Sequence, residues 1–494
     1  MSEIAEARAV HEGNESPYLQ GNFAPVRKET TATALEVTGT IPGHLDGRYL
    51  KIGPNPLGDP DPERYEWFLG AGMVHGLRIR DGHAEWYRNR WVRSGEVARA
   101  LGERPRRGPQ LGGFDFAANT NVIGLGDRTF AITEGGARPQ ELSQELETIG
   151  PSDFCGTLRG GYTAHPKRDP ATGDLHAVSY SPFHGNRVQY TVTGVDGRVR
   201  RAVDIPMRTG TMMHDFSLTE RHVIIYDLPV VLDLSMLARA RAGRAAGALL
   251  TRVAAAHPLP GPLERAAMRA SSRGRSPSRL PYRWDPAHRP RVGVMPRDGG
   301  PAHLRWYDVE PCYVYHPLNA YEDGERIVLE VARHEKVFVR GAADPIVAPP
   351  TLDRWTIDRA AGSVKEERLD DRGQEFPRVD ERLVGRRHRY GYTVGGLTAE
   401  STAPQALIKH DLRRGTSETV AFGAGREPGE FVFVPSCGDA AEDDGVVMGF
   451  VYDAASDRSD LVLLDAASLE TVATVHLPVR VPHGFHGNWV PAAG

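Results

Sequence analysis

Four of the nineteen histidines stand in apolar, strand-like stretches that are bounded by glycine or proline. They are 49, 102 and 170 residues apart, which excludes a local zinc finger or an HExxH module. Neutral imidazoles bind zinc, copper, iron or nickel, and an all-nitrogen ligand set leaves the metal cationic, with open positions for O2 or substrate. The pattern therefore predicts a metal site, with redox chemistry as one use of it, built from His165, His214, His316 and His486.

The segments around these histidines repeat one strand pattern. Each contains three short runs of alternating apolar and polar residues separated by turns, over residues 174–206, 325–370, 392–423 and 444–478. An isolated three-stranded meander cannot bury both of its faces, whereas several meanders around an axis bury a continuous core. The repetition predicts an all-β protein, a single β-propeller domain over residues 1–494.

Two of the histidines occupy the same place after a repeat. His214 comes eight residues after Pro206, and His486 comes eight residues after Pro478, where two of the repeats end. In a propeller the chain leaves an outer strand and crosses to the innermost strand of the next blade, beside the central axis. We therefore expect both side chains to converge at the hub.

Composition argues against several other classes of protein. The chain has 494 residues, 40% of them hydrophobic and 25% charged, and a net charge of −4, which gives no reason to expect nucleic-acid binding. Its apolar runs are far shorter than the ~20 residues that a membrane-spanning helix needs. The N-terminus lacks the apolar core of a secretory signal, and three widely spaced cysteines argue against a disulfide framework. We expect a cytoplasmic protein.

One segment, residues 230–290, departs from the strand pattern as a basic amphipathic insertion. Between Met236 and Arg283 the chain carries ten arginines and a single acidic residue, Glu264. Residues 236–256 are rich in Ala, Leu and Arg, which is typical of an amphipathic helix. One interpretation of the insertion is a solvated surface element. The other is a patch, over residues 236–283, that contacts anionic lipid. Such a patch would place the protein peripherally on the inner membrane surface.

Motifs along nearly the whole chain resemble those of the carotenoid cleavage oxygenases. They occur in the family's order: "GNFAPVRKET" (21–30), "IPGHLDGRYLKIGPNP" (41–56), "WFLGAGMVHGLRI" (67–79), "WYRNRWVRS" (86–94), "ANTNVI", "EGGARPQEL", "HPKRDPATGDLHAVSY", "MHDFSLTERHVII", "EPCYVYHPLNAYEDG", "RRHRYGY", "GEFVFVP", "AEDDG" and "GFHG". The resemblance implies a seven-bladed β-propeller with a helical and loop cap over one face, covering an iron site. Within these motifs, we read the glycines of "GAGMVHG" as a turn and His75 as a structural residue.

The resemblance also implies roles for individual residues. The four histidines would be the ligands of a non-haem Fe(II) ion, and His483, which stands where similar chains usually have Tyr, would be a neighbour and not a ligand. Three glutamates would orient three of the ligands and leave His165 without a carboxylate: Glu134 for His214, Glu375 for His316 and Glu430 for His486. The methyl group of Thr120 would crowd one open iron position and direct O2 to the other.

The implied reaction is the oxidative cleavage of a conjugated double bond by O2 into two carbonyl products, with a hydrophobic polyene as substrate. Stilbene-cleaving relatives tend to carry a Lys before the first of the three glutamates, where this chain has Thr133. Together with the basic insertion, this favours a carotenoid or apocarotenoid over a stilbene. A further class of relatives isomerises retinyl esters without O2, and nothing in the sequence signals ester handling. A non-enzymatic propeller scaffold remains the alternative from another class.

Overall fold

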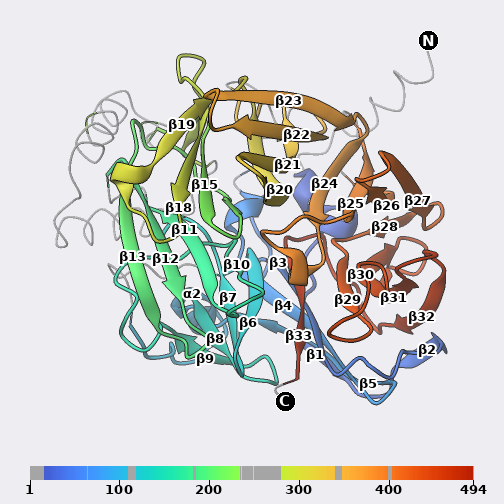
Figure 1. The fold of residues 1–494 in the computed structure, drawn as a ribbon. Coiled ribbons are helices and arrows are strands. Elements are labelled where there is room, and N and C mark those ends of the chain that lie inside the picture. Colours follow the sequence, from blue (N-terminus) through green and yellow to red (C-terminus); the bar gives the residue numbers. More distant parts are fainter. Residues whose placement is uncertain are drawn as a thin grey trace, which may run out of the picture.

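Seven β-sheets are arranged as blades around a central axis (Figure 1). The structure is a computed structural model that describes residues 16–63, 65–109, 118–181, 185–233, 235, 249, 280–339, 346, 348–398 and 403–492. This confirms the predicted all-β, seven-bladed propeller.

The first four blades follow one another along the chain, except that the C-terminal strand joins the first. Blade one is ordered β1-β5-β4-β3-β33, and the other three run in sequence from the inner to the outer strand. The strands are β1 (Thr30–Ala32), β3 (Gly47–Pro54), β4 (Gly72–Arg80), β5 (His83–Trp91) and β33 (Gly487–Pro491); β6 (Asn121–Leu125), β7 (Arg128–Ile132), β8 (Gln140–Leu142) and β9 (Thr148–Pro151); β10 (Lys167–Arg168), β11 (Leu175–Tyr180), β12 (Arg187–Thr193) and β13 (Val199–Pro206); and β14 (Ser217–Leu218), β15 (His222–Asp227), β18 (Arg291–Pro296) and β19 (Arg305–Asp308).

The last three blades repeat this plan, and the N-terminal strand β2 joins the seventh. There, β28 and β29 both pair with β30. The strands are β20 (Tyr313–Asp323), β21 (Arg326–His334), β22 (Thr351–Asp358) and β23 (Ser363–Asp370); β24 (Gly373–Arg378), β25 (Tyr390–Leu397), β26 (Ala406–Asp411) and β27 (Thr416–Ala421); and β2 (Glu36–Gly39), β28 (Arg426–Pro428), β29 (Val432–Pro435), β30 (Gly445–Asp453), β31 (Arg458–Asp465) and β32 (Thr471–His476).

Three of the four predicted repeats form the three outer strands of a blade, and the repeat at 444–478 forms β30, β31 and β32, outside which β2 is added. Burial explains their composition, because strands in the middle of a blade are covered on both faces. All six residues of β11 and of β26 are buried, whereas β27, at the outer edge, is mostly exposed. Central strands are therefore continuously apolar or hydrogen-bonded, and outer strands carry more polar residues.

The two ends of the chain close the ring. Strand β33 pairs with β3 from Gly47↔Pro491 to Lys51↔Gly487, and β2 pairs with β32. Figure 1 shows the red strand β33 beside blue strands of the first blade, and the blue strand β2 at the edge of the red seventh blade. The C-terminal strand β33 thus completes the first blade, and the N-terminal strand β2 completes the seventh.

The predicted turn around "GAGMVHG" is wrong. Gly72–Arg80 is the strand β4, and its glycines serve close packing between elements. A Cβ atom on Gly72 would lie 1.9 Å from the carbonyl oxygen of Ala118, and one on Gly76 would lie 2.7 Å from the Leu146 side chain. His75 is a structural residue of this strand, as expected, and its Nδ1 lies 2.8 Å from the Tyr87 hydroxyl.

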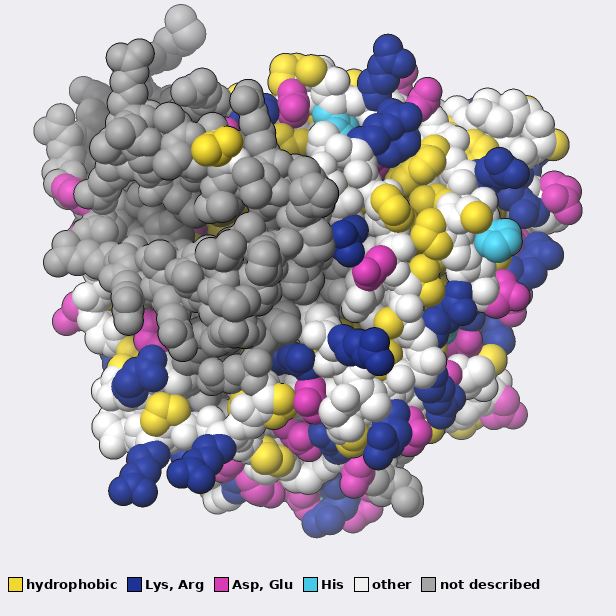
Figure 2. Space-filling model, turned by 90° about the vertical axis from the view of Figure 1, so that its left-hand side faces the viewer, with side chains coloured by type: hydrophobic (Ala, Val, Ile, Leu, Met, Phe, Trp, Pro, Cys, Tyr) yellow, Lys and Arg dark blue, Asp and Glu magenta, His cyan; other side chains and the backbone are white. Residues whose placement is uncertain are grey.

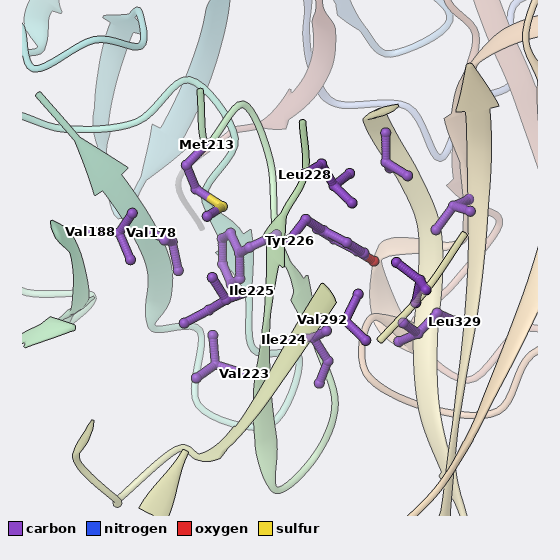
Figure 3. Packing of buried hydrophobic residues seen from close by; sticks show 14 of the residues in the cluster. Val178, Val188, Met213, Val223, Ile224, Ile225, Tyr226, Leu228, Val292 and Leu329 are labelled. Carbon is purple, nitrogen blue, oxygen red and sulfur yellow. The ribbon is translucent and has the colours of Figure 1, made fainter. Parts of the chain in front are cut away.

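The core lies between adjacent blades. The cluster of buried residues in Figure 3 joins strands of the third, fourth and fifth blades through side chains such as Val178, Ile225, Val292 and Leu329, each at most 1% exposed. This apolar contact between neighbours holds the blades at fixed angles around the hub.

The described helices are short. They are η1 (Pro17–Leu19), η2 (Gly21–Phe23), η3 (Trp67–Leu69), α2 (Gly95–Ala100), η5 (Pro301–His303) and η6 (Glu381–Leu383). Rings from η2 and η3 lie against His483 and Phe485: Trp67 and Phe68 contact Phe485 at 4.7 and 5.6 Å between centroids, and Phe23 contacts His483 at 4.7 Å. Tyr18 of η1 stacks on Trp67. These turns are the described part of the predicted cap on the side of the hub where the chain reaches His486.

The base of the predicted insertion is a two-stranded ribbon. Strand β16 (Val230–Leu232) pairs with β17 (Tyr282–Trp284), so the two ends of the segment lie side by side. The predicted amphipathic helix at 236–256 and the basic loop after it lie, apart from residues 249, 280 and 281, outside the described residues.

The surface carries both signs of charge. On the described part of the face in Figure 2, Lys and Arg side chains are interspersed with Asp and Glu. Among the described residues, no helix is long and apolar enough to cross a membrane.

Candidate metal centre

The four predicted histidines meet at the hub. His316 lies in the inner strand β20, and the other three lie within three residues before the inner strands β10, β14 and β33. The His165 ring centroid is 4.4, 5.2 and 4.7 Å from those of His214, His316 and His486, and the rings of His316 and His486 are 4.7 Å apart. Four separate blades thus deliver one imidazole each.

The ring nitrogens of three of the four histidines are close enough together to hold a metal ion, and His486 joins them by the distances between ring centroids. His165, His214 and His316 each offer a nitrogen within 4.8 Å of the other two, and the Nε2 atoms of His214 and His316 are 3.2 Å apart. The Nε2 atom of His165 is buried and has no hydrogen-bond partner among the described residues. A buried polar atom without a partner is costly, and a cation bound at the hub would use its lone pair.

Each of three imidazoles is oriented by a carboxylate. The Nδ1 atom of His214 lies 3.1 Å from Glu134, that of His316 lies 2.7 Å from Glu375, and that of His486 lies 3.1 Å from Glu430. Donation from Nδ1 leaves the lone pair on Nε2, which is the arrangement of metal-ligating histidines. These are the three pairs that the resemblance implies.

His165 is held differently. The nearest carboxylate, Asp215, lies 3.9 Å from its Nδ1 and is engaged at 2.8 Å by the Lys167 ammonium. Burial lowers the pKa of His165 well below its usual value, and the neighbouring histidines lower it further. The imidazole is therefore neutral at neutral pH, as a ligand must be.

In the histidine–glutamate pairs, burial and the charge of the partner shift the pKa of each group in opposite directions. Burial lowers the pKa of His316 despite Glu375. At His214 burial also lowers the pKa, but Glu134, Asp215 and Glu375 together outweigh it, and the pKa is raised. Burial alone would raise the pKa of Glu375 and Glu430, but their histidine partners lower both, that of Glu430 to about 2 with help from Arg378. These two carboxylates are thus ionised acceptors.

The structure adds contacts that the sequence did not suggest. Each carboxylate touches one further side chain: Tyr180 donates to Glu134 at 3.4 Å, His334 lies 3.0 Å from Glu375, and Arg378 donates to Glu430 at 3.3 Å. Arg378 follows Glu375 by three residues in "QEFPR", but nothing in that string indicates a contact with Glu430, which is 52 residues further on.

Thr120 lies directly before the inner strand β6, next to the ligand cluster. Its carbonyl accepts the His486 backbone N–H at 3.1 Å, and its hydroxyl lies 2.9 Å from both Asn119 and Thr133. His483 stands apart from the cluster, with its Nε2 at 2.6 Å from Glu427. Thr120 and Thr133 therefore lie together beside the segment that carries His486.

Aromatic rings pack around the imidazoles. Phe376 stacks on His316 with centroids 5.5 Å apart and meets His486 edge-on at 5.4 Å, and Tyr315 meets His214 edge-on at 5.0 Å. Such rings shield part of the cluster from water. The imidazole nitrogens are thus surrounded by aromatic rings and by the three carboxylates that contact them.

Comparison with known proteins agrees with this geometry. The family model described as retinal pigment epithelial membrane protein matches residues 23–491. The chain is 50% identical to the carotenoid cleavage oxygenase of Mycobacterium tuberculosis, over 97% of this chain and 98% of that one. It superposes on the lignostilbene dioxygenase of Pseudomonas brassicacearum with a TM-score of 0.80 and 25% identity, covering 96% and 98% of the two chains.

A third relative is a Synechocystis apocarotenoid oxygenase variant. Its crystal structure matches with a TM-score of 0.78 and 26% identity, over 97% of this chain and 100% of that one. The chain therefore belongs to the retinal pigment epithelial membrane protein family, which includes the carotenoid cleavage oxygenases, and it is an oxidoreductase of the dioxygenase type.

Proposed function

We propose that the protein is an Fe(II)-dependent dioxygenase that cleaves a conjugated double bond of a carotenoid or apocarotenoid into two carbonyl products. The observation that carries the proposal is the convergence of four imidazoles, three of them oriented by carboxylates, around the unpartnered Nε2 of His165. His165, His214, His316 and His486 would hold the ion. Ferrous iron, when bound, supplies the redox chemistry that makes O2 reactive toward an electron-rich double bond.

The protein's own groups position the reactants and keep the site dry. Both atoms of O2 end in the two carbonyl groups, so the reaction needs no external reductant and no general acid or base. Phe376 and Tyr315 cover the imidazoles, and we propose that the Thr120 methyl group fills one open position and leaves O2 the other. The hydroxyl of Thr120 supports this role, because its contacts with Asn119 and Thr133 restrict the side-chain rotamer.

Thr133 favours a hydrocarbon substrate over a phenolate. It is 5% exposed, and its hydroxyl contacts Thr120 where a stilbene-cleaving relative would carry a Lys. A buried threonine gives a phenolate no charged partner, whereas a polyene needs none. The 50% identity to a carotenoid cleavage oxygenase points the same way. A stilbene is the second candidate, because the lignostilbene dioxygenase shares the fold at a TM-score of 0.80.

One experiment tests the function directly. The protein is reconstituted with Fe(II) without oxygen, exposed to air with apocarotenals or a hydroxystilbene, and its products are identified by mass spectrometry. We expect two carbonyl fragments from the apocarotenal, with one atom of ¹⁸O from ¹⁸O2 in each. Cleavage of the stilbene alone would replace the substrate class, and no cleavage of either by an iron-loaded protein would contradict the proposal.

We also propose a cytoplasmic protein that reaches its lipid-dissolved substrate by peripheral membrane contact through residues 236–283. The ten arginines and the apolar residues of this segment support contact with anionic lipid. Co-sedimentation with anionic vesicles tests it: recovery in the supernatant at low salt would contradict the contact.

A further inference from the structure

Arg378 joins three blades where the ring closes. It is the last residue of β24 in the sixth blade, and its side chain reaches Glu430 in the seventh blade and the strand that follows His486 in the first. Its Nη1 donates to the Glu430 carboxylate at 3.3 Å and to the Gly487 carbonyl at 3.0 Å. Its Nη2 donates to the side-chain oxygen of Asn488 at 2.9 Å.

Glu430 is held between the imidazole, the backbone and Arg378. It is 3% exposed, and its carboxylate accepts hydrogen bonds from His486 at 3.1 Å and from the Gly487 backbone N–H at 2.7 Å. Arg378 adds a charge-assisted hydrogen bond to the same carboxylate at 3.3 Å. Because the planar guanidinium also grips Gly487 and Asn488, it fixes the carboxylate relative to the strand that follows His486.

The other two carboxylates are held by different chemistry. Glu134 is contacted by the phenol of Tyr180 and Glu375 by the imidazole of His334. Among the described contacts of the three, Glu430 alone hydrogen-bonds an arginine. His486 also differs from the other three histidines because it precedes the C-terminal strand, which no later blade holds in place.

We propose that Arg378 is a positioning residue for the metal site. It fixes the Glu430 carboxylate and the backbone directly after His486, and through both contacts it sets the orientation of the His486 imidazole. The inference rests on the proposed function in assuming that the four histidines bind a metal. It adds a residue that contacts neither the metal nor the substrate and acts through Glu430.

Cobalt binding tests the inference without turnover. Co(II) is titrated into the metal-free wild type, R378M and R378K, and its visible absorption reports the number and geometry of the ligands. We expect R378M to bind Co(II) ~10–100-fold more weakly than the wild type, with a changed spectrum. R378K should lie between the two, because lysine restores the charge but lacks the planar fork that grips two partners.

Arg291 is the matched control. It is also buried, it donates from Nε to Asp227 at 2.8 Å and lies over the Trp306 ring at 3.8 Å, and it belongs to the fourth blade. R291M should lower the thermal midpoint, Tm, and leave the Co(II) affinity and spectrum unchanged. In an E430Q background R378M should add a smaller loss than in the wild type, because the contact with Glu430 is already weakened and only the contacts with Gly487 and Asn488 remain to be lost.

Two results would overturn the inference: a Co(II) affinity and spectrum of R378M equal to those of the wild type, or an equal loss in R291M. The proposed function is tested by a separate measurement, the cleavage of a polyene by the iron-loaded wild type. If R378M loses cobalt as expected but the iron-loaded wild type cleaves no polyene, the proposed function fails and the positioning role stands. If the wild type cleaves and R378M binds metal normally, only the positioning role fails. A wild type that binds neither Co(II) nor Fe(II) would overturn both.

Discussion

Three of the imidazoles at the hub, those of His214, His316 and His486, have a defined orientation because each contacts a carboxylate that is itself held. The Glu375 carboxylate, for example, lies 2.7 Å from His316 and 3.0 Å from His334, and the backbone N–H of Phe376 also donates to it. Such a chain of contacts stops the ligand ring from rotating and keeps its Nε2 directed at the hub.

Removal of one ligand tests this at the residue scale. We expect H316A to bind less than stoichiometric iron, by metal analysis after reconstitution, and to lose double-bond cleavage. The exposed His83, at the start of β5, is the control, and H83A should keep both. Full iron content in H316A would show that the remaining three histidines suffice to bind the ion.

Replacement of the carboxylate that orients His316 is a milder change. E375Q should keep the His316 imidazole and lower the iron affinity by ~10–100-fold.

The sequence predicted which histidines meet at the hub better than it predicted their surroundings. His214 and His486 could be placed at the hub from their equal spacing after Pro206 and Pro478, and the structure brings both there. The acceptor glutamates came from resemblance. The contacts of Arg378 and His334 could not be predicted, because a side chain's reach across blades depends on the ring geometry and leaves no local pattern.

At the scale of elements, the repeats marked four blades but not the inner strands. Strands β10 and β14 have two residues each, too few to show an alternation of apolar and polar positions. The fourth blade was hidden because the insertion separates β15 from β18. The pairing of β33 with β3 joins residues more than 400 positions apart, so the composition of either strand does not reveal it.

The contact between β3 and the residues just before β33, the seam that closes the ring, depends on the absence of a side chain at Gly53. A Cβ atom there would lie 2.5 Å from the Gly484 Cα, and the neighbouring Ile52 exchanges backbone hydrogen bonds of 3.0 and 3.1 Å with Phe485 and His486. We expect G53V to push this segment off β3, to destabilise the protein by about 1–3 kcal/mol and to reduce its iron content.

Gly43 provides the control for the seam, because a Cβ atom there would meet nothing within 4 Å. G43V should therefore keep the Tm and the iron content of the wild type. A G53V protein with normal iron content would show that His486 reaches the hub without the close approach of these two segments.

At the scale of the whole molecule, buried neutral histidines make the metal-free protein sensitive to mild acid. Burial lowers the pKa of His75 to about 3, and it lowers the pKa of both His176 and His410 to about 4. The unfolded chain binds these protons near pH 6.5, whereas the folded chain excludes them until the pH is far lower. Falling pH therefore favours the unfolded chain, by about 2 kcal/mol per histidine between pH 7 and pH 5.

We expect the Tm of the metal-free protein to be clearly lower at pH 5 than at pH 7, measured by calorimetry. His214 and His288 oppose this trend, because Glu134 and Asp227 raise their pKa values despite burial, but they are fewer. Acidic groups such as Glu430, with a pKa of about 2, lose their contribution only at lower pH. A Tm that stays level or rises toward pH 5 would contradict the expectation.

Closure of the ring by β33 has a consequence for synthesis of the protein. His486 and β33 are translated more than 400 residues after β3, and the first blade has no inner strand until they arrive. A chain that has not yet been translated as far as His486 therefore holds an open ring with three of its four imidazoles. The hub can assemble only after this late segment is made, and a chain truncated before His486 would lack one imidazole and the innermost strand of the first blade.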